Sequence, residues 1–151
     1  MSKGYYVRDF MSSPAVTIPV TARLLDAAMA LRSSAIRHLL IVDANRVVGI
    51  ISDRDIQRCA PSRLVPITEA KYNAIFENTP LASVMTREPT SISPGALLAD
   101  AAAIFQEGKL GCLPVVENET LLGIITRYDL MAALLQVLNG KTTPADSEAG
   151  S

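Results

Sequence analysis

Hydrophobic and polar positions follow the same series of patterns in each half of the chain. Each series starts with a short extended stretch, "AVTI" or "TSI", and continues with apolar residues at helical spacing. Two apolar runs follow, "HLLIVD" with "RVVGIIS" and then "CLPVVE" with "TLLGIIT", and a helix closes each series. The pattern predicts strand, helix, strand, strand, helix twice over. The near-continuous apolarity of the runs indicates strands covered on both faces.

The similarity of the two halves extends to individual residues. A shift of 74 residues aligns positions 11–56 with 85–130 without a gap, and 13 of the 46 aligned positions are identical. Average residue usage would give about three identities. The chain is therefore an internal duplication, and we expect each copy to bury its apolar surface against the other.

The boundaries of the copies follow from the same alignment. We expect an α/β protein with a first unit at 7–60, a connector at 61–80, a second unit at 81–138 and a disordered tail at 139–151. The connector contains "ITEAKYNAIFEN", which predicts a short helix with Thr68 as its N-cap.

Composition narrows the function without identifying it. The 151 residues carry a net charge of −1, which gives no overall attraction to nucleic acid or to an anionic membrane. The two cysteines cannot form a disulfide framework, and we see neither a secretory signal nor an apolar run of about 18 residues. We therefore expect a cytoplasmic protein that binds no nucleic acid and no membrane.

The last apolar run of each copy ends in a short polar motif, Ser52-x-x-Asp55 or Thr126-x-x-Asp129. One interpretation is a helix cap, in which the hydroxyl and the carboxylate bond to backbone N–H groups. The other is a nucleotide site, because a helix N-terminus attracts phosphate and a carboxylate accepts hydrogen bonds from both ribose hydroxyls. A glycine three residues before each hydroxyl lets backbone or ligand come close. The motif alone leaves both interpretations open.

The polar motifs occur with two further pairs of segments: "VRDFMSSPAVTI" with "LASVMTREPTSI", and "IRHLLIVD" with "LGCLPVVE". This combination resembles the cystathionine-β-synthase (CBS) domain, and the duplication resembles a tandem CBS domain pair, or Bateman module, of the stand-alone bacterial type. The resemblance covers about 7–138. It implies two βαββα units packed about a pseudo-twofold axis, with adenine nucleotides or S-adenosylmethionine bound in clefts between them.

The resemblance also implies roles for individual residues. The closing carboxylates, Asp55 and Asp129, would hold the ribose. The other implied contacts are Ser52, Thr126, Arg37, His38, Arg54 and Arg127 for hydroxyls and phosphate, and Thr17, Ile18, Ser91 and Ile92 for the base. The resemblance implies no catalytic residue, no metal site and no required cofactor.

The two copies differ in a way that bears on the ligand. Gly111 and Cys112 stand where the first copy has Arg37 and His38, so the second copy offers less positive charge to a phosphate. Catalysis by a Cys112 thiolate with His38 as its base is a further alternative. The place of Cys112 at the start of an apolar strand argues against it.

These observations together predict a non-enzymatic regulatory module that binds an adenosyl ligand and acts on an effector protein the sequence does not identify. The alternative is a ligand-free interaction or scaffold module, in which both Ser/Thr-x-x-Asp motifs serve only as helix caps. The last helix contains the very apolar "LMAALLQVL", which predicts that the chain forms a homodimer.

Overall fold

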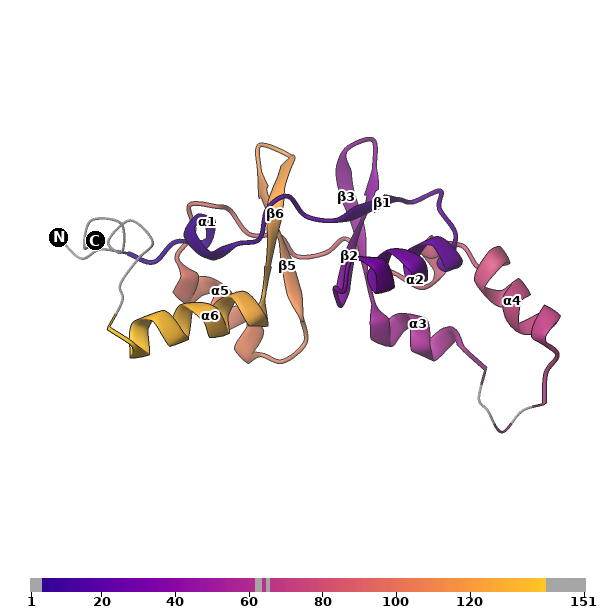
Figure 1. Cartoon of the computed structure of the whole chain (residues 1–151). Helices are drawn as coiled ribbons and strands as arrows, with labels where there is room; N and C mark the ends of the chain where they lie inside the picture. Colours follow the sequence, from indigo (N-terminus) through magenta and orange to yellow (C-terminus); the bar gives the residue numbers. More distant parts are fainter. Residues whose placement is uncertain (1–3, 62–63, 65, 141–151) are drawn as a thin grey trace. The chain divides into compact units, whose positions relative to one another are not determined.

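The computed structural model describes residues 4–61, 64 and 66–140. The chain forms two compact units (Figure 1). Val16–Pro89 is called the central unit, and Met1–Ala15 with Thr90–Ser151 is called the terminal unit. Each unit has its own sheet, its own helices and its own apolar core.

The central unit is built on a sheet whose strands lie in the order β1-β2-β3-β4. β1 (Thr17–Pro19) is parallel to β2 (His38–Asp43), and α2 (Leu24–Ser33) connects them. β2 is antiparallel to β3 (Arg46–Ser52), which leads directly into α3 (Asp53–Cys59). The mixed α/β fold and the βαββα order predicted for the first copy are confirmed.

A tight turn joins β2 to β3. Ala44 and Asn45 have φ angles of 51° and 68°, as the two central residues of a type I′ hairpin turn do. The second copy has the same turn, at Asn118 and Glu119, with φ angles of 50° and 64°. The twist of this turn type matches that of the paired strands, so both copies close their hairpins in the same way.

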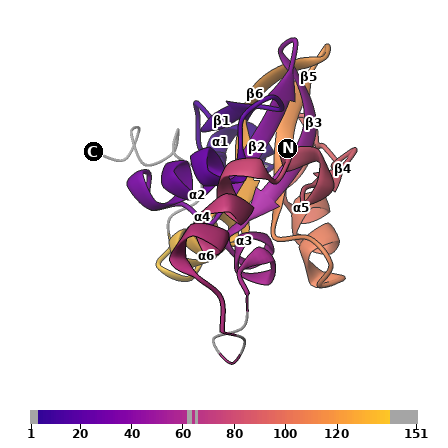
Figure 2. The same cartoon turned by 90° about the vertical axis from the view of Figure 1, so that its right-hand side faces the viewer.

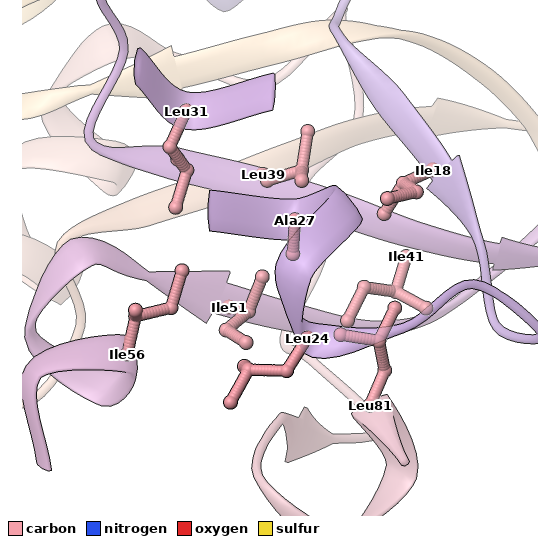
Figure 3. Packing of buried hydrophobic residues seen from close by; sticks show 9 residues of the cluster. All are labelled: Ile18, Leu24, Ala27, Leu31, Leu39, Ile41, Ile51, Ile56 and Leu81. Carbon is pink, nitrogen blue, oxygen red and sulfur yellow. The ribbon is translucent and has the colours of Figure 1, made fainter. Parts of the chain in front are cut away.

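The core of the central unit gathers apolar side chains from the sheet, from α2 and α3, and from η1 (Leu81–Ser83), as Figure 3 shows. The α2 residues recur at helical spacing, which is the pattern that predicted this helix. The members are Ile18, Leu24, Ala27, Leu31, Leu39, Ile41, Ile51, Ile56 and Leu81.

The terminal unit has the same architecture around the second copy. α5 (Leu98–Gln106) precedes a hairpin of β5 (Cys112–Glu117) and β6 (Thr120–Thr126), and α6 (Arg127–Leu138) follows directly. Both helices lie beside the hairpin in Figure 1. The core consists of Val7, Ile92, Ala101, Phe105, Leu113, Val115 and Ile125.

The first strand predicted for the second copy is reduced to a single bridge at Ile92. Two prolines account for the difference. In the first copy, the N–H groups of Val20 and Leu40 donate hydrogen bonds between the first two strands. The aligned residues in the second copy are Pro94 and Pro114, which have no N–H to donate.

The two copies exchange the segments that precede their first strands. α1 (Val7–Phe10) belongs to the first copy by sequence, but Val7 is fully buried in the core of the terminal unit. Leu81, which aligns with Val7, is fully buried in the core of the central unit. β4 (Thr86–Arg87) then pairs with β3. Each compact unit therefore combines the sheet of one copy with the leading segment of the other.

The connector contains the predicted helix, α4 (Glu69–Asn78), which lies beside α2 (Figure 2). Thr68 is its N-cap, and the hydroxyl accepts a hydrogen bond from the Lys71 N–H at 3.2 Å. The tail predicted at 139–151 lies outside the described residues from 141 on. Within the described part of the chain, every helix lacks the length or the apolarity needed to cross a membrane.

Candidate ligand-binding site

In the central unit, the Ser-x-x-Asp motif lies where β3 ends and α3 begins. The Ser52 hydroxyl accepts a hydrogen bond from the Asp55 N–H at 3.2 Å, and the Ser52 N–H donates to Asp55 Oδ2 at 2.8 Å. The hydroxyl also donates to the same Oδ2 at 2.9 Å. The predicted cap geometry is present, and on the carboxylate it uses one oxygen, Oδ2.

In the terminal unit, the motif has the same capping box where β6 leads into α6. The Thr126 N–H donates to Asp129 Oδ2 at 2.8 Å, and the Thr126 hydroxyl lies 3.3 Å from the same oxygen as a donor. The two units therefore use the aspartate Oδ2 alike at the start of the helix. In both, the cap engages Oδ2 of the aspartate and leaves Oδ1 for other partners.

The second carboxylate oxygen, Oδ1, has a different neighbour in each unit. In the central unit it lies 3.6 Å from Nη1 of Arg58, whose side chain is 74% exposed, against 18% for Asp55. In the terminal unit Asp129 Oδ1 accepts a hydrogen bond from the Ser12 hydroxyl at 3.1 Å. One oxygen thus faces an exposed cation, and the other faces a neutral donor from a segment distant in sequence.

Ser12 is fixed in place by its own backbone. Its N–H donates to the Ile124 carbonyl at 2.8 Å, and its carbonyl accepts from the Ile124 N–H at 2.9 Å. The Ser13 hydroxyl donates to the Leu122 carbonyl at 2.7 Å. A Cβ atom on Gly123 would lie 2.5 Å from the Ser12 carbonyl oxygen. Glycine is required at 123 because the crossing segment lies directly against the strand.

The repeated glycine has a related role in the central unit. A Cβ atom on Gly49 would lie 2.4 Å from Sδ and 2.9 Å from Cγ of Met85. The neighbouring pair Ile50 and Thr86 aligns with Ile124 and Ser12 of the terminal unit. The sequence motif predicted a close approach of backbone or ligand at these glycines. The structure gives that approach to the exchanged segment of the other copy.

Several predicted contacts of the first copy meet at one corner of the central unit. His38 is paired with Ser52 across β2 and β3, and the Arg37 carbonyl accepts a hydrogen bond from the Asp53 N–H at 3.1 Å. Arg37 and Arg54 are exposed, and His38 is half-buried. In the terminal unit, the matching corner pairs the buried Cys112 with Thr126, so cationic side chains do not gather there in the same way.

Arg127 of the terminal unit occupies the position of Asp53 in the central unit, so this position of the motif is cationic in one unit and anionic in the other. Its Nη2 donates a hydrogen bond to the Leu110 carbonyl at 3.1 Å, which ties the start of α6 to the loop before β5. The guanidinium therefore has a structural partner. Arg54, one position further along α3 in the central unit, is an exposed side chain of the first helical turn.

The residues predicted to contact a base are divided between surface and core. The side chains of Thr17 and Ser91 are exposed. Ile18 and Ile92 are only 7% and 9% exposed and belong to the two apolar cores. Any base contact by these isoleucines would involve the little side-chain surface that remains or the backbone, and the base site stays a prediction.

The thiols are poorly suited to nucleophilic catalysis. Burial raises the pKa of Cys112 to about 12, so the thiol is protonated at neutral pH. Burial, and secondly the charge of Asp55, raise the pKa of Cys59 as well. Among the described residues, no group of three or more His, Cys, Asp or Glu side chains could hold a metal ion.

Two residues beside the carboxylates, Ser12 and Arg58, were not predicted from the sequence. A signal for Ser12 exists, because Ser12 and Thr86 align and both carry a hydroxyl after the repeated methionine. The residue that aligns with Arg58 is Ala132, so the duplication gives no signal for that contact.

The CBS domain family matches residues 7–61 and 81–136, which is most of the chain. The protein belongs to the CBS domain family and is a tandem CBS pair.

Three solved structures illustrate the similarity. The AcuB protein of Vibrio cholerae is 36% identical, with a TM-score of 0.74, over 91% of this chain and 95% of that one. CBSX2 in complex with AMP is 29% identical, with a TM-score of 0.73, over 89% and 98% of the chains; CBSX2 is an Arabidopsis thaliana protein. The CBS domain pair of protein MJ0100, in complex with 5′-methylthioadenosine and S-adenosyl-L-methionine, is 25% identical, with a TM-score of 0.68, over 84% and 97%.

The length of the relatives varies. The chain spans 92% of a curated relative from Dictyostelium discoideum, but 23–24% of three longer relatives from Arabidopsis thaliana.

Proposed function

We propose that this protein is a non-enzymatic regulatory module that binds an adenine nucleotide or a related adenosyl ligand at its Ser/Thr-x-x-Asp motifs. The observation that carries the proposal is that the two oxygens of each aspartate carboxylate have different partners. Oδ2 of Asp55 and of Asp129 is used by the helix cap, while among the described residues Oδ1 has one side-chain partner, Arg58 or Ser12. A carboxylate in this position can cap the helix and accept ribose hydroxyls at the same time.

The ligand class is supported by what the similar structures share. AMP, 5′-methylthioadenosine and S-adenosyl-L-methionine, named in two of those structures, have one part in common: an adenosine substituted at its 5′ position. A ribose-binding carboxylate recognises that common part, and it does not depend on the charge of the 5′ substituent. We therefore assign Asp55 and Asp129 to the ribose and leave the 5′ group to residues that differ between the units.

The residues that differ favour the central unit for an anionic ligand. Arg37, His38 and Arg54 lie on or next to its motif, whereas Gly111 and Cys112 take the first two places in the terminal unit. Hydrogen bonds from a charged donor to phosphate are about twice as strong as neutral ones. We propose that the central site takes the more anionic ligand and the terminal site the less anionic one.

The test is ligand-linked thermal stability, with AMP, ADP, ATP, S-adenosylmethionine and NAD(H) screened against the purified protein. A ligand at about 100 times its dissociation constant stabilises the folded state by about 2.7 kcal/mol, which raises the melting temperature by several degrees. Absorbance at 260 nm of the purified protein reports copurified nucleotide. If no compound shifts the melting temperature at millimolar concentration and none copurifies, the scaffold alternative replaces the proposal.

The partner proposal concerns α6. A stripe of its apolar side chains is exposed at helical spacing: Tyr128 is 62%, Met131 58%, Leu135 59% and Leu138 71% exposed. An exposed apolar stripe of this kind is typical of an interaction surface. We propose that α6 forms the interface of a cytoplasmic homodimer, through which ligand binding is passed to an effector protein.

A further inference from the structure

The Ser12 hydroxyl lies beside the Asp129 carboxylate in the terminal unit. It comes from the exchanged leading segment, 117 residues from its hydrogen-bond partner Asp129. Its place is set by the two backbone bonds to Ile124 and by the space that Gly123 leaves. Ser12 is itself exposed, so its hydroxyl is open to a ligand that reaches Asp129.

We propose that Ser12 and Asp129 together form a two-atom acceptor that recognises the vicinal diol of ribose. This makes the terminal site more selective for an intact diol than the central site. The proposal rests on the proposed function, because it requires an adenosyl ligand at Asp129. It adds a specificity-determining residue, Ser12. This residue belongs to the first copy by sequence but lies against β6 of the second copy.

The hydrogen-bonding capacity of Asp129 leads to this assignment. An ionised carboxylate accepts about four hydrogen bonds, about two at each oxygen. At Asp129, Oδ2 already receives the N–H and the hydroxyl of Thr126, and Oδ1 receives the Ser12 hydroxyl. One acceptor position therefore remains on Oδ1, which is enough for one ribose hydroxyl but not for both.

Ser12 supplies the second acceptor position. A serine hydroxyl that donates its proton keeps two lone pairs, so Ser12 Oγ can accept a hydrogen bond while it donates to Asp129. Oγ and Oδ1 are 3.1 Å apart. Two donors on adjacent ribose carbons fit such a pair, one on each oxygen. Loss of either ribose hydroxyl would leave one of the two acceptors without its donor.

The central site is built differently at the same point. Oδ1 of Asp55 faces the Arg58 guanidinium, which has donors only and cannot accept a ribose hydroxyl. Thr86, which aligns with Ser12, pairs through its backbone with Ile50, and in the described part of the chain no hydrogen bond joins it to Asp55. The diol at the central site therefore has Oδ1 alone, in competition with Arg58, and its recognition is less strict.

The experiment measures diol selectivity at the terminal site by titration calorimetry. Asp55→Asn weakens the central site and leaves the terminal site as the dominant one. In this background we measure the affinities for AMP, 2′-deoxy-AMP and 3′-deoxy-AMP. Each ligand is titrated into three proteins: one that retains Ser12, one with Ser12→Ala and one with Ser12→Thr. Thr86→Ala is the matched control, because it removes the aligned hydroxyl from the other unit. Melting temperatures without ligand check that all variants fold alike.

With Ser12 present, each deoxy analogue should bind about tenfold more weakly than AMP, as expected for the loss of one hydrogen bond to or near a charged group. Ser12→Ala should weaken AMP by a similar factor. It should also leave at least one deoxy analogue unchanged, namely the one that lacks the hydroxyl bound by Ser12. Ser12→Thr should keep the selectivity of serine, and Thr86→Ala should change none of these values.

Three outcomes would overturn the proposal. An equal loss for AMP and both analogues in Ser12→Ala would mean that Ser12 only positions Asp129. A single site per chain in the unmodified protein, weakened by Asp55→Asn and unchanged by Asp129→Asn, would mean that the terminal site is empty and that the proposed function holds for the central site alone. No binding by the unmodified protein would overturn the proposed function itself.

A second measurement keeps the proposal open to test even if Ser12→Ala does not fold. It compares the diol selectivity of the terminal site, measured in Asp55→Asn, with that of the central site, measured in Asp129→Asn. The terminal site should be the more selective of the two. Equal selectivity, or greater selectivity at the central site, would contradict the two-atom acceptor.

Discussion

The central and terminal units use one motif for the same structural task but surround it differently. Ser52 with Asp55 and Thr126 with Asp129 form the same capping box, with an N–H to Oδ2 distance of 2.8 Å in both. The neighbours of Oδ1 are unlike: Arg58 in one unit and Ser12 in the other. The duplication has kept the half of the carboxylate that starts the helix and has diverged at the half that faces solvent. Because the helix cap requires only Oδ2, the different neighbours of Oδ1 are where we propose that the ligand preferences of the two units differ.

The largest expected effect concerns the helices that follow the two motifs. α3 is short and carries charged side chains, whereas α6 carries the exposed apolar stripe. Leu135→Glu places a charge in the middle of that stripe and should convert the proposed homodimer to monomer, because a charge buried in an apolar interface is strongly unfavourable. Light scattering measures the change against the 16.1 kDa mass of one chain.

The control for the dimer prediction is Met29→Glu on α2 of the central unit. Met29 is exposed to a similar extent, 61% against 59% for Leu135, but it lies outside the stripe. It should leave the mass unchanged. An unmodified protein that is already monomeric at working concentration would refute the proposed interface.

The next effect compares the two glycines. Gly123→Ala brings a methyl group against the backbone carbonyl of Ser12, at 2.5 Å, and should destabilise the fold by about 2–3 kcal/mol because backbone cannot move aside. Gly49→Ala meets mainly the flexible side chain of Met85 and should cost about 1 kcal/mol. Urea denaturation of both variants gives the two free energies. The reverse order would show that the exchanged segment is held less tightly at β6 than at β3.

The carboxylates themselves should show a smaller effect, confined to binding. Asp55→Asn and Asp129→Asn replace one acceptor oxygen with a donor, and each should weaken one adenosyl site about tenfold. Stability should fall by about 1 kcal/mol or less, because asparagine still forms part of a helix cap. Calorimetric titration decides the matter. Unchanged affinity in both variants would leave the caps as the full explanation of the motif.

The smallest effect tests the charge difference between the units. Arg54→Ala should weaken the central site several-fold for ATP and less for S-adenosylmethionine, since it removes a cation near the proposed phosphate position. Arg127→Ala should weaken nucleotide binding less, because its guanidinium is hydrogen-bonded to the Leu110 carbonyl. Affinity of the central site should also fall with added salt. A larger loss from Arg127→Ala would assign phosphate binding to the terminal unit.

The sequence predicted the repeat, the order of elements and the start of each closing helix, because these depend on local pattern. It did not predict the exchange of leading segments. Val7 and Leu81 occupy the same place in two similar copies, so the pattern looks identical whichever sheet receives each segment. The lost first strand of the second copy could have been anticipated, since Pro94 and Pro114 both lack the N–H that a strand needs there.

The contact between Ser12 and Asp129 was the least predictable part of the candidate site. The hydrogen bond between Ser12 and Asp129 joins residues 117 positions apart, and its geometry depends on the exchange. The capping contacts, by contrast, lie within three residues and follow from the motif alone. The capping contacts could therefore be predicted from the sequence, whereas the neighbours of Oδ1 could not.

The exchange of leading segments also sets an order of events during synthesis. The central unit is one continuous stretch, Val16–Pro89, and all of its chain has left the ribosome soon after Pro89 is made. The terminal unit needs Val7 and Ser12, which precede the central unit in the sequence, together with strands that follow it. Because chains grow at about 5–20 residues per second and domains fold as units, we expect the central unit to fold first. The segment that carries Val7 and Ser12, although synthesised before the central unit, must wait for its partner strands until the central unit has been made.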